Sequence, residues 1–574
     1  MSKQYWIVRG WLWAAALSLA ATTVAPQAQL AAPQVPPQAQ PAPPQAQTSS
    51  TSRMTPDQQR QLLSLVDELI KFSSGETGLP IKSAVKRQIT SRATVEKYLQ
   101  KKFDEDESAK RLQRDEIVLE KFGLLDRDFA LKPFLLALLK EQIEAYYDAK
   151  TKTVYMLDWV DIEEQKPVLA HELTHALQDQ HSDLEKWNNQ TPDDVSLNFS
   201  EDTGHLAKDE MDTAREAVVE GQATAVMMDY ILKPMGKSLV KDPEVSDLVR
   251  HHMAASEDSP VLARAPLMIS ESLLFPYREG LSFEQDVWMD QGQEAAFAGT
   301  LDHPPTSSWE IINPREYEKR HVPAVPLLPN IHPLVDKLYK PYDIGQIGQL
   351  DLHILTELFG GDQAAGNLTP AWNGGLYWAG QRLSAKTPQE LASTNSIALF
   401  YLSVWKNSAS ARAFARLYAD ELGRKYSGVK FDSADERTAP ASPSAGFSVF
   451  PPPASSDEEQ VYSTSEGPVV ITIRGKMVFV AESFPLDLAR KLTTLILDAQ
   501  GSGELKMADI SGAPSFPRIS AEKAGGIETS STVAPISTLA SEPLQPLTGN
   551  LIRFFSHCGV MKVVVEAEIK AAEK

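Results

Sequence analysis

Two histidines, His171 and His175, lie four positions apart in the segment HELTHALQDQH (171–181), and Glu172 directly follows the first. Residues i and i+4 of an α-helix share a face, so both imidazoles can reach one Zn²⁺ at about 2.0–2.1 Å. Glu172 projects beside them, where its carboxylate can take a proton from a water molecule that the metal activates. The pattern predicts a hydrolytic metal centre. The alternative is a solvated helix face, since a chain with 11 histidines contains the pattern by chance in roughly one or two cases in a hundred.

A catalytic zinc takes three protein ligands, and a downstream helix offers the third. The segment 209–234 has helical apolar spacing and carries Glu216 and Glu220, which are one turn apart. Gly221 inside this helix costs about 1 kcal/mol relative to alanine, so we expect a close approach to another element, such as the histidine-bearing helix. A glutamate beside that contact can reach the metal.

These motifs resemble a known family. HELTH, followed 45 positions after His175 by Glu220 in EGQAT, is similar to the gluzincin branch of zinc metallopeptidases. Together with FPYREG (275–280) and HPPTSSWEIINPREY (303–317), the motifs resemble more closely a group of exported bacterial metallopeptidases. The resemblance covers residues 90–330 well and 345–500 loosely. It implies a zinc ion held by His171, His175 and Glu220, Glu172 as the general base, and a peptide or protein substrate, without specifying which one.

Other polar side chains could serve the same reaction. A peptidase needs a donor near the developing oxyanion, and zincins commonly supply a tyrosine or histidine. The candidates, none singled out by spacing, are Tyr277, Tyr317, His205 and His303. We expect Asp179 and His181 to be polar residues of the helix end, although Asp179 could instead orient a ligand histidine.

The elements that position these residues are mainly helical. Helices are predicted after Thr55-Pro56 and over 131–143, and Pro167 is expected at the start of the histidine-bearing helix. Residues 144–157 predict a β-hairpin around the polar turn 148–152. Zincins carry an edge strand beside the active-site helix on which a peptide can pair, and this hairpin could provide it or be purely structural.

The fold class expected is therefore α+β and mainly helical. The family resemblance implies that residues 53–344 form a zincin-like metallopeptidase domain with a small edge-strand sheet, and a smaller α+β domain is expected over 345–500. That second domain reads as a helix and then two strand–strand–helix units, with a disordered insertion near 437–459. Its WNGGLY (372–377) departs from the Trp-Gly-Gly-Asp of related proteins, which weakens any transfer of function.

The N-terminus predicts export. Residues 1–25 have the layout of a signal peptide, and 26–52, with seven Pro and seven Gln, predict a disordered linker. An uncleaved anchor is the alternative, because no cleavage site is clean. We expect a secreted or periplasmic protein without stable membrane insertion after processing, and a mostly disordered tail over 501–574.

Charge and cysteine content exclude other classes. The net charge of −20 opposes nucleic-acid binding. Cys558 is the single cysteine and lies far from HELTH, so disulfides, thiolate zinc clusters and a deformylase-like cysteine ligand are discounted. Two hypotheses remain. One is an exported zinc peptidase, and the other is a non-catalytic envelope protein that keeps a zincin scaffold for binding or assembly.

Overall fold

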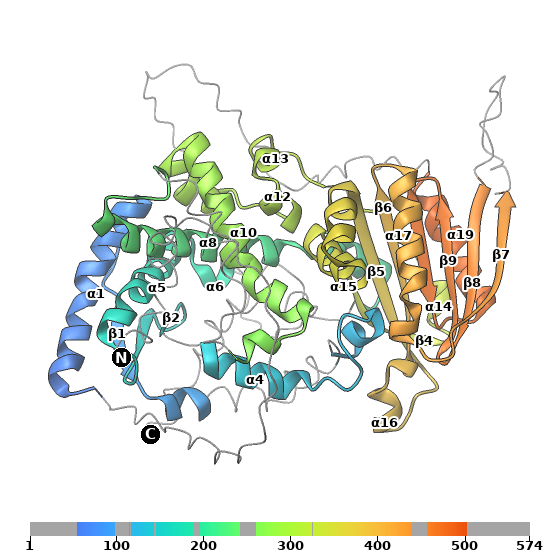
Figure 1. Cartoon of the computed structure of the whole chain (residues 1–574), viewed down its shortest axis with the longest axis horizontal. Coiled ribbons are helices and arrows are strands. Elements are labelled where there is room, and N and C mark those ends of the chain that lie inside the picture. Colours follow the sequence, from blue (N-terminus) through green and yellow to red (C-terminus); the bar gives the residue numbers. More distant parts are fainter. Residues whose placement is uncertain are drawn as a thin grey trace, which may run out of the picture.

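The computed structural model describes residues 54–97, 114, 116–142, 145–187, 196–241, 260–323, 325–438 and 456–501. The expected leader, the linker and all but the first residue of the expected tail lie outside these ranges. Within them, the chain is a mixed α+β protein in which a mainly helical part lies beside a separate β-sheet (Figure 1). Within these residues, no helix combines the length and the apolar character needed to cross a bilayer.

Four long helices form the frame of the helical part. Helix α1 (Pro56–Thr77) starts at a capping box, in which Thr55 and Gln58 satisfy each other's backbone N–H groups. Helix α5 (Ile162–Ser182) packs against α1 and against α8 (Met211–Leu232), and α8 packs along α10 (Leu267–Gln291). The helices predicted after Thr55 and over 209–234 are thus confirmed.

Shorter helical elements complete this part. They are α4 (Leu131–Gln142), α6 (Leu184–Trp187), α7 (Phe199–Leu206), η1 (Lys233–Met235), η2 (Leu262–Arg264), the π-helical turn η3 (Ala295–Gly299), α11 (Thr300–Asp302), α12 (Ser308–Ile312), α13 (Pro314–Glu318) and α14 (His332–Val335). Helix α4 confirms the helix expected over 131–143, ending at Gln142.

A three-stranded sheet lies against the start of this frame. The predicted hairpin is confirmed, because β2 (Ala145–Asp148) and β3 (Thr153–Leu157) are antiparallel with Tyr146 opposite Tyr155. Strand β1 (Lys86–Thr90) then pairs parallel to β3, which gives the order β1-β3-β2. Strand β2 is therefore an outer strand, and it also contacts α5.

The start of α5 differs from the prediction. The helix begins at Ile162, where the Asp161 side chain accepts a hydrogen bond from Glu163 N–H, and Pro167 lies inside it. The helix therefore starts more than a turn before the proline, and Asp161 caps its first turn. Pro167 lies in the helix although it has no N–H to donate there. The expectation that Pro167 starts this helix was wrong.

The second sheet has seven strands in the order β4-β5-β6-β10-β9-β8-β7, with every neighbouring pair antiparallel. The strands are β4 (Tyr339–Gln346), β5 (Trp372–Arg382), β6 (Ile397–Trp405), β7 (Lys430–Thr438), β8 (Ser456–Thr464), β9 (Gly467–Arg474) and β10 (Met477–Glu482). The associated helices are α15 (Gln349–Leu368), η4 (Thr369–Ala371), α16 (Pro388–Leu391), η5 (Thr394–Ser396), α17 (Ser408–Asp420), α18 (Leu422–Lys425) and α19 (Leu486–Ala499). The two predicted strand–strand–helix units, β5-β6-α17 and β9-β10-α19, are confirmed.

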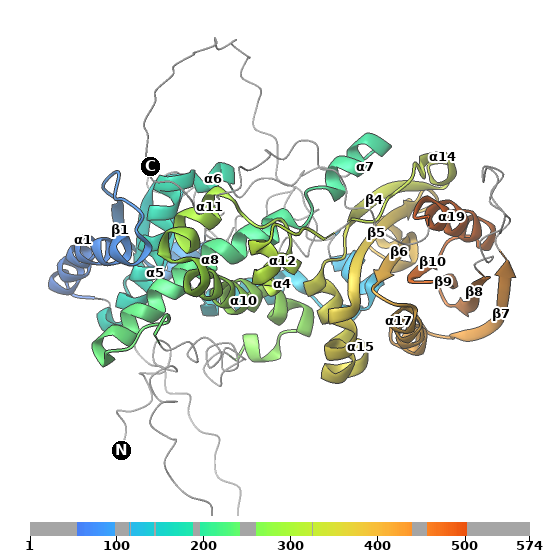
Figure 2. The ribbon, with the colours of Figure 1, turned by 90° about the horizontal axis from the view of Figure 1, so that it is seen from above.

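Helices cover both faces of this sheet (Figure 2). Side chains alternate along β5, so that Tyr377 joins the core under α15 and α17, whereas Leu376 and Trp378 join the core under α14 and α19. Because both faces of the sheet are covered, the central strands β6 and β10 are buried along their whole length and are nearly continuous apolar runs.

The domain limits differ in two places from those expected. Strand β4 crosses the boundary placed at residue 345, because its pairing with β5 begins at Tyr339. The ends of the expected insertion at 437–459 belong to the paired strands β7 and β8. Residues 439–455 lie outside the described part.

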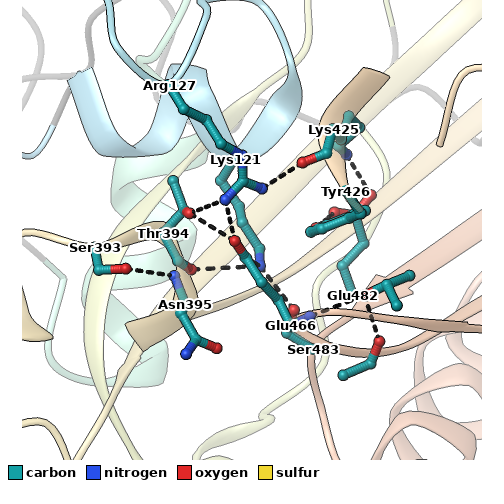
Figure 3. A network of polar contacts seen from close by, with 12 residues as sticks. Lys121, Arg127, Ser393, Thr394, Asn395, Lys425, Tyr426, Glu466, Glu482 and Ser483 are labelled. Atoms are coloured by element: carbon teal, nitrogen blue, oxygen red, sulfur yellow. Dashed lines mark hydrogen bonds and ion pairs between the residues drawn. The ribbon is translucent and has the colours of Figure 1, made fainter. Parts of the chain in front are cut away.

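The segment 116–130, expected within the helical domain, packs on the seven-stranded sheet. The ring of Phe122 meets Tyr377 and Tyr401 edge-on, at centroid distances of 5.2 and 6.3 Å. The Nζ of the fully buried Lys121 lies 2.8 Å from Glu466 Oε2 and 2.7 Å from Ser483 Oγ (Figure 3). Burial lowers the pKa of Lys121 to about 8. The core of the sheet therefore includes residues from well before the hairpin in sequence.

Candidate metal centre

The two histidines of α5 point at one another across a single turn. The Nε2 atoms of His171 and His175 lie 3.0 Å apart, and their rings are almost perpendicular, at 82°. Both side chains are buried, with His175 only 1% exposed. One face of α5 thus presents two nitrogens to the same point, inside the protein rather than on a solvated surface.

Glu220 of α8 brings a carboxylate to the same point. Its Oε2 lies 3.1 Å from His171 Nε2 and 3.5 Å from His175 Nε2. Glu220 is 1% exposed, so its charge is removed from water and needs a partner. The structure therefore brings together the three residues that the family resemblance implies as ligands, and Glu172 lies within reach of the same histidines.

A close helix crossing holds α8 in this position. A Cβ added to Gly221 would lie 2.3 Å from the backbone C and O of Gly280 in α10, and one added to Gly280 would lie 2.2 Å from Ala217 O. The close approach expected at Gly221 is present, but its partner is α10 instead of the histidine-bearing α5. Two glycines at the contact let the backbones touch, and the residue before Gly221 is Glu220, so this crossing places Glu220 beside the two histidines.

These three residues fit a tetrahedral metal. Zinc bonds of about 2.0–2.1 Å at tetrahedral angles place ligand atoms about 3.3 Å apart. The three separations of 3.0, 3.1 and 3.5 Å scatter closely around that value. Two imidazole nitrogens and one carboxylate oxygen are also ligands that zinc accepts in hydrolytic enzymes.

Glu172 lies beside the two histidines and is held by the hairpin. His171, Glu172 and His175 each offer a ligand atom within 4.8 Å of the others. The backbone N–H of Tyr147, in the outer strand β2, donates to Glu172 Oε2 at 2.7 Å. Since this N–H points away from β3, the edge of β2 faces the metal centre.

Asp179 secures the hairpin from the other side. The Tyr147 hydroxyl donates to Asp179 Oδ2 at 2.7 Å, and Lys152 Nζ lies 2.8 Å from Asp179 Oδ1. The structure therefore gives Asp179 a role in fixing Tyr147, whose backbone holds Glu172, and shows no ligand histidine among these partners. His181 pairs with Asp302 at 2.9 Å in a more exposed setting, as expected of the helix end.

The candidates for the oxyanion donor fall in different places. The Tyr277 ring lies 6.3 Å from the His171 ring and nearly parallel to it, at 21°. The Tyr317 hydroxyl donates to His303 O at 2.6 Å, and burial raises the pKa of Tyr317 to about 12. His205 is buried in α7. Tyr277 thus has a ring contact to a proposed ligand.

Two functional features were missed in the sequence. The Nδ1 of His175 lies 2.7 Å from Gln178 Oε1, although Gln178 stands in the quoted segment HELTHALQDQH. The link from Tyr147 to Glu172 uses a backbone atom, so no side-chain pattern could reveal it. The spacing of His175 and Gln178, three residues apart on one helix face, is the signal that could have identified the first.

The structure therefore brings together two imidazole nitrogens, the Glu220 carboxylate and the Glu172 carboxylate, with the outer strand β2 beside them. Searches of the whole chain against protein-family models, curated proteins and solved structures found no match in any of the three. The likeness to gluzincins accordingly stays a prediction, and the geometry of the centre carries the functional argument.

Proposed function

We propose that the protein is a zinc-dependent peptidase with a zincin-like fold, in which His171, His175 and Glu220 hold the metal and Glu172 is the general base. The observation that carries the proposal is the buried triangle of ligand atoms with separations of 3.0–3.5 Å. A carboxylate within 4.8 Å of the histidine nitrogens accompanies it. Hydrolysis requires a base at the position of Glu172, and this supports catalysis over the binding scaffold.

In this proposal, each residue of the centre has a separate role in hydrolysis. A bound zinc ion would polarise the scissile carbonyl and make the attacking water more acidic. Glu172 would accept the proton of that water and pass it to the departing amine. The Tyr147 N–H holds one oxygen of Glu172, so the base is fixed relative to both α5 and β2. Tyr277, stacked near His171, is our candidate for donating a hydrogen bond to the oxyanion.

A peptide or protein substrate is supported by the position of β2. This strand is the outer strand of its sheet, and its edge faces Glu172. The backbone of an extended peptide that paired with β2 would lie close to Glu172, the proposed base. The net charge of −20 supports a substrate other than nucleic acid.

The proposed location is outside the cytoplasm, either secreted or periplasmic. It rests on the N-terminal layout of residues 1–25 and on the Pro- and Gln-rich segment that follows. N-terminal sequencing of the processed protein tests it. A mature chain that begins between about residues 21 and 32 is expected from the position of the apolar run.

Replacement of Glu172 by glutamine tests the catalytic proposal, because the side chain keeps its shape and the three ligands stay intact. We expect Glu172→Gln to retain zinc and thermal stability while hydrolysis of a mixed-peptide library falls by about 10²-fold or more. The matched control is Glu163→Gln on the same helix, since the Glu163 side chain is 71% exposed and pairs with Lys166 on the surface. The control should bind zinc and cleave as the wild type does.

Two results would reject the peptidase. One is a zinc-loaded wild type that cleaves no peptide in the library, and the other is a Glu172→Gln variant that cleaves as fast as the wild type. Zinc bound without cleavage would favour the binding or assembly scaffold. If the wild type binds no zinc, the proposed metal centre is rejected as well.

A further inference from the structure

A chain of buried amides runs from His175 away from the metal centre. Gln178 Oε1 lies 2.7 Å from His175 Nδ1, and Gln178 Nε2 donates to Val219 O and to Gln222 Oε1, both at 2.9 Å. Gln222 Nε2 in turn faces Ala296 O at 3.0 Å and Phe297 O at 2.9 Å. Both glutamines are 0% exposed. The chain links α5, α8 and the turn η3.

The direction of every hydrogen bond in this chain follows from its far end. Backbone carbonyls only accept, so the group of Gln222 that faces Ala296 O and Phe297 O must be its NH₂. Its Oε1 therefore faces Gln178 and accepts from the Gln178 NH₂, which also donates to Val219 O. Gln178 then presents its oxygen to His175, and His175 Nδ1 must carry the proton.

The consequence for His175 is a fixed tautomer. A neutral imidazole with its proton on Nδ1 has its lone pair on Nε2, the atom that lies 3.0 Å from His171 Nε2 and 3.5 Å from Glu220 Oε2. The same contacts fix the ring orientation. Both properties follow from contacts that involve no metal.

The turn η3, at the far end of the amide chain, presents the two carbonyls that Gln222 contacts. Residues 295–299 form a π-helical turn, a rare geometry in which carbonyls are displaced from the α-helical ladder. Gln222 Nε2 also lies 2.8 Å from Thr300 Oγ1, directly after the turn. Thr300 Oγ1 is 3.2 Å from Glu284 Oε1 of α10, and burial raises the pKa of the Glu284 carboxyl well above its usual range. The amide chain thus ends at two backbone carbonyls and at the Thr300 hydroxyl, which are held by η3 and α10.

We propose that Gln178 and Gln222 are positioning residues that hold His175 in its metal-binding tautomer and orientation. Gln222 is itself oriented by the carbonyls of Ala296 and Phe297, which accept from its NH₂ group. The inference rests on the zinc site of the proposed function. Neither glutamine touches the metal, and each acts through His175. Partners behind a ligand histidine typically contribute 10–100-fold to metal affinity.

The test measures zinc affinity and histidine tautomer instead of activity. Zinc dissociation constants are measured by competition with a chromophoric chelator for the wild type, Gln178→Met, Gln222→Met and the double variant. We expect about a 10–100-fold weaker affinity for Gln178→Met. A smaller loss is expected for Gln222→Met, because Val219 O still orients Gln178. The loss in the double variant should be less than the product of the two, since both act on one chain.

Gln165→Met is the matched control. Gln165 is also 0% exposed on α5, and its Nε2 donates to two carbonyls, Leu157 O and Val160 O, as Gln222 does to its own pair. Gln165→Met therefore removes a buried amide of the same kind, but one whose hydrogen bonds to Leu157 O and Val160 O do not lead to His175. Nitrogen-15 NMR of the metal-free proteins at about pH 8, where imidazoles are neutral, should show the Nδ1–H tautomer of His175 in the wild type and in Gln165→Met. Gln178→Met should show a mixture.

The outcomes separate this inference from the proposed function. If the wild type binds zinc but Gln222→Met and Gln178→Met weaken binding no more than Gln165→Met does, the positioning role is overturned and the zinc site stands. An unchanged His175 tautomer in Gln178→Met overturns it as well. A wild type that binds no zinc overturns both.

Discussion

The crossing of α8 and α10 gives a sharp prediction at Gly221. A Cβ at this position would lie 2.3 Å from both C and O of Gly280 and 2.9 Å from its Cα. All three are backbone atoms, so no side chain can rotate away, and the helices must separate by about 1 Å to restore van der Waals contact. Overpacking of this kind costs about 1–3 kcal/mol. At this rigid contact we expect the upper end of that range.

The helix propensity of alanine offsets part of this cost. Alanine is favoured over glycine in a helix by about 1 kcal/mol, so Gly221→Ala should lower the free energy of unfolding by about 2 kcal/mol net. Gly204 in α7 is the control, because a Cβ there meets nothing within 4 Å. Gly204→Ala should raise the free energy of unfolding by about 0.5–1 kcal/mol. The two substitutions should therefore differ by about 3 kcal/mol.

Metal binding gives a second measurement on the same variants. Glu220 precedes Gly221, and a metal site tolerates errors of only about 0.2 Å in its ligand distances. A shift of α8 by about 1 Å should weaken zinc binding in Gly221→Ala and leave it unchanged in Gly204→Ala. Urea unfolding of the metal-free proteins and chelator competition provide the data. Equal stability and equal zinc affinity of the two variants would refute the close crossing as the device that places Glu220.

Three further predictions concern the centre and its helix. Glu220→Ala should release most of the zinc, measured as metal content, and Glu216→Ala should release less; equal or reversed losses would overturn the choice of ligand. Tyr277→Phe should retain zinc and reduce kcat by about 10²-fold, and unchanged kcat would remove Tyr277 as the oxyanion donor. Burial raises the pKa of Asp229 in α8 to about 6. Between about pH 4 and 6 the folded state keeps a proton that the unfolded state has released, so Asp229 makes stability fall as pH rises through this window. Urea unfolding should show that Asp229→Asn gains about 2 kcal/mol relative to the wild type from pH 4 to pH 7; parallel pH profiles would contradict this.

The local elements could be predicted from the sequence. Alternating aromatic and β-branched residues around a polar turn give the hairpin β2–β3, because side chains on a strand alternate between faces. The spacing of His171 and His175 places two imidazoles on one helix face for an equally local reason. The strand–strand–helix units of the C-terminal sheet follow from the same periodicities.

The third ligand could be predicted only in part. Helical spacing placed Glu216 and Glu220 on one face, and the family resemblance chose Glu220. The glycine that follows it indicated a close approach, since a glycine inside a helix is costly without one. The sequence does not indicate which element approaches Gly221. In the structure that element is α10, through Gly280, and not α5.

Contacts between distant segments were decided by the tertiary structure. Strand β1 pairs with β3, and Lys121 and Phe122 enter the core of a sheet whose strands begin more than two hundred positions later. Gln178 and Gln222 look like ordinary polar residues until the π-helical turn presents two carbonyls to Gln222. The spacing of apolar residues in a helix or strand depends on the backbone geometry of that one element, so a short stretch of sequence is enough to reveal it. Which buried donor meets which acceptor depends on how whole elements pack, and that is settled only when the chain has folded.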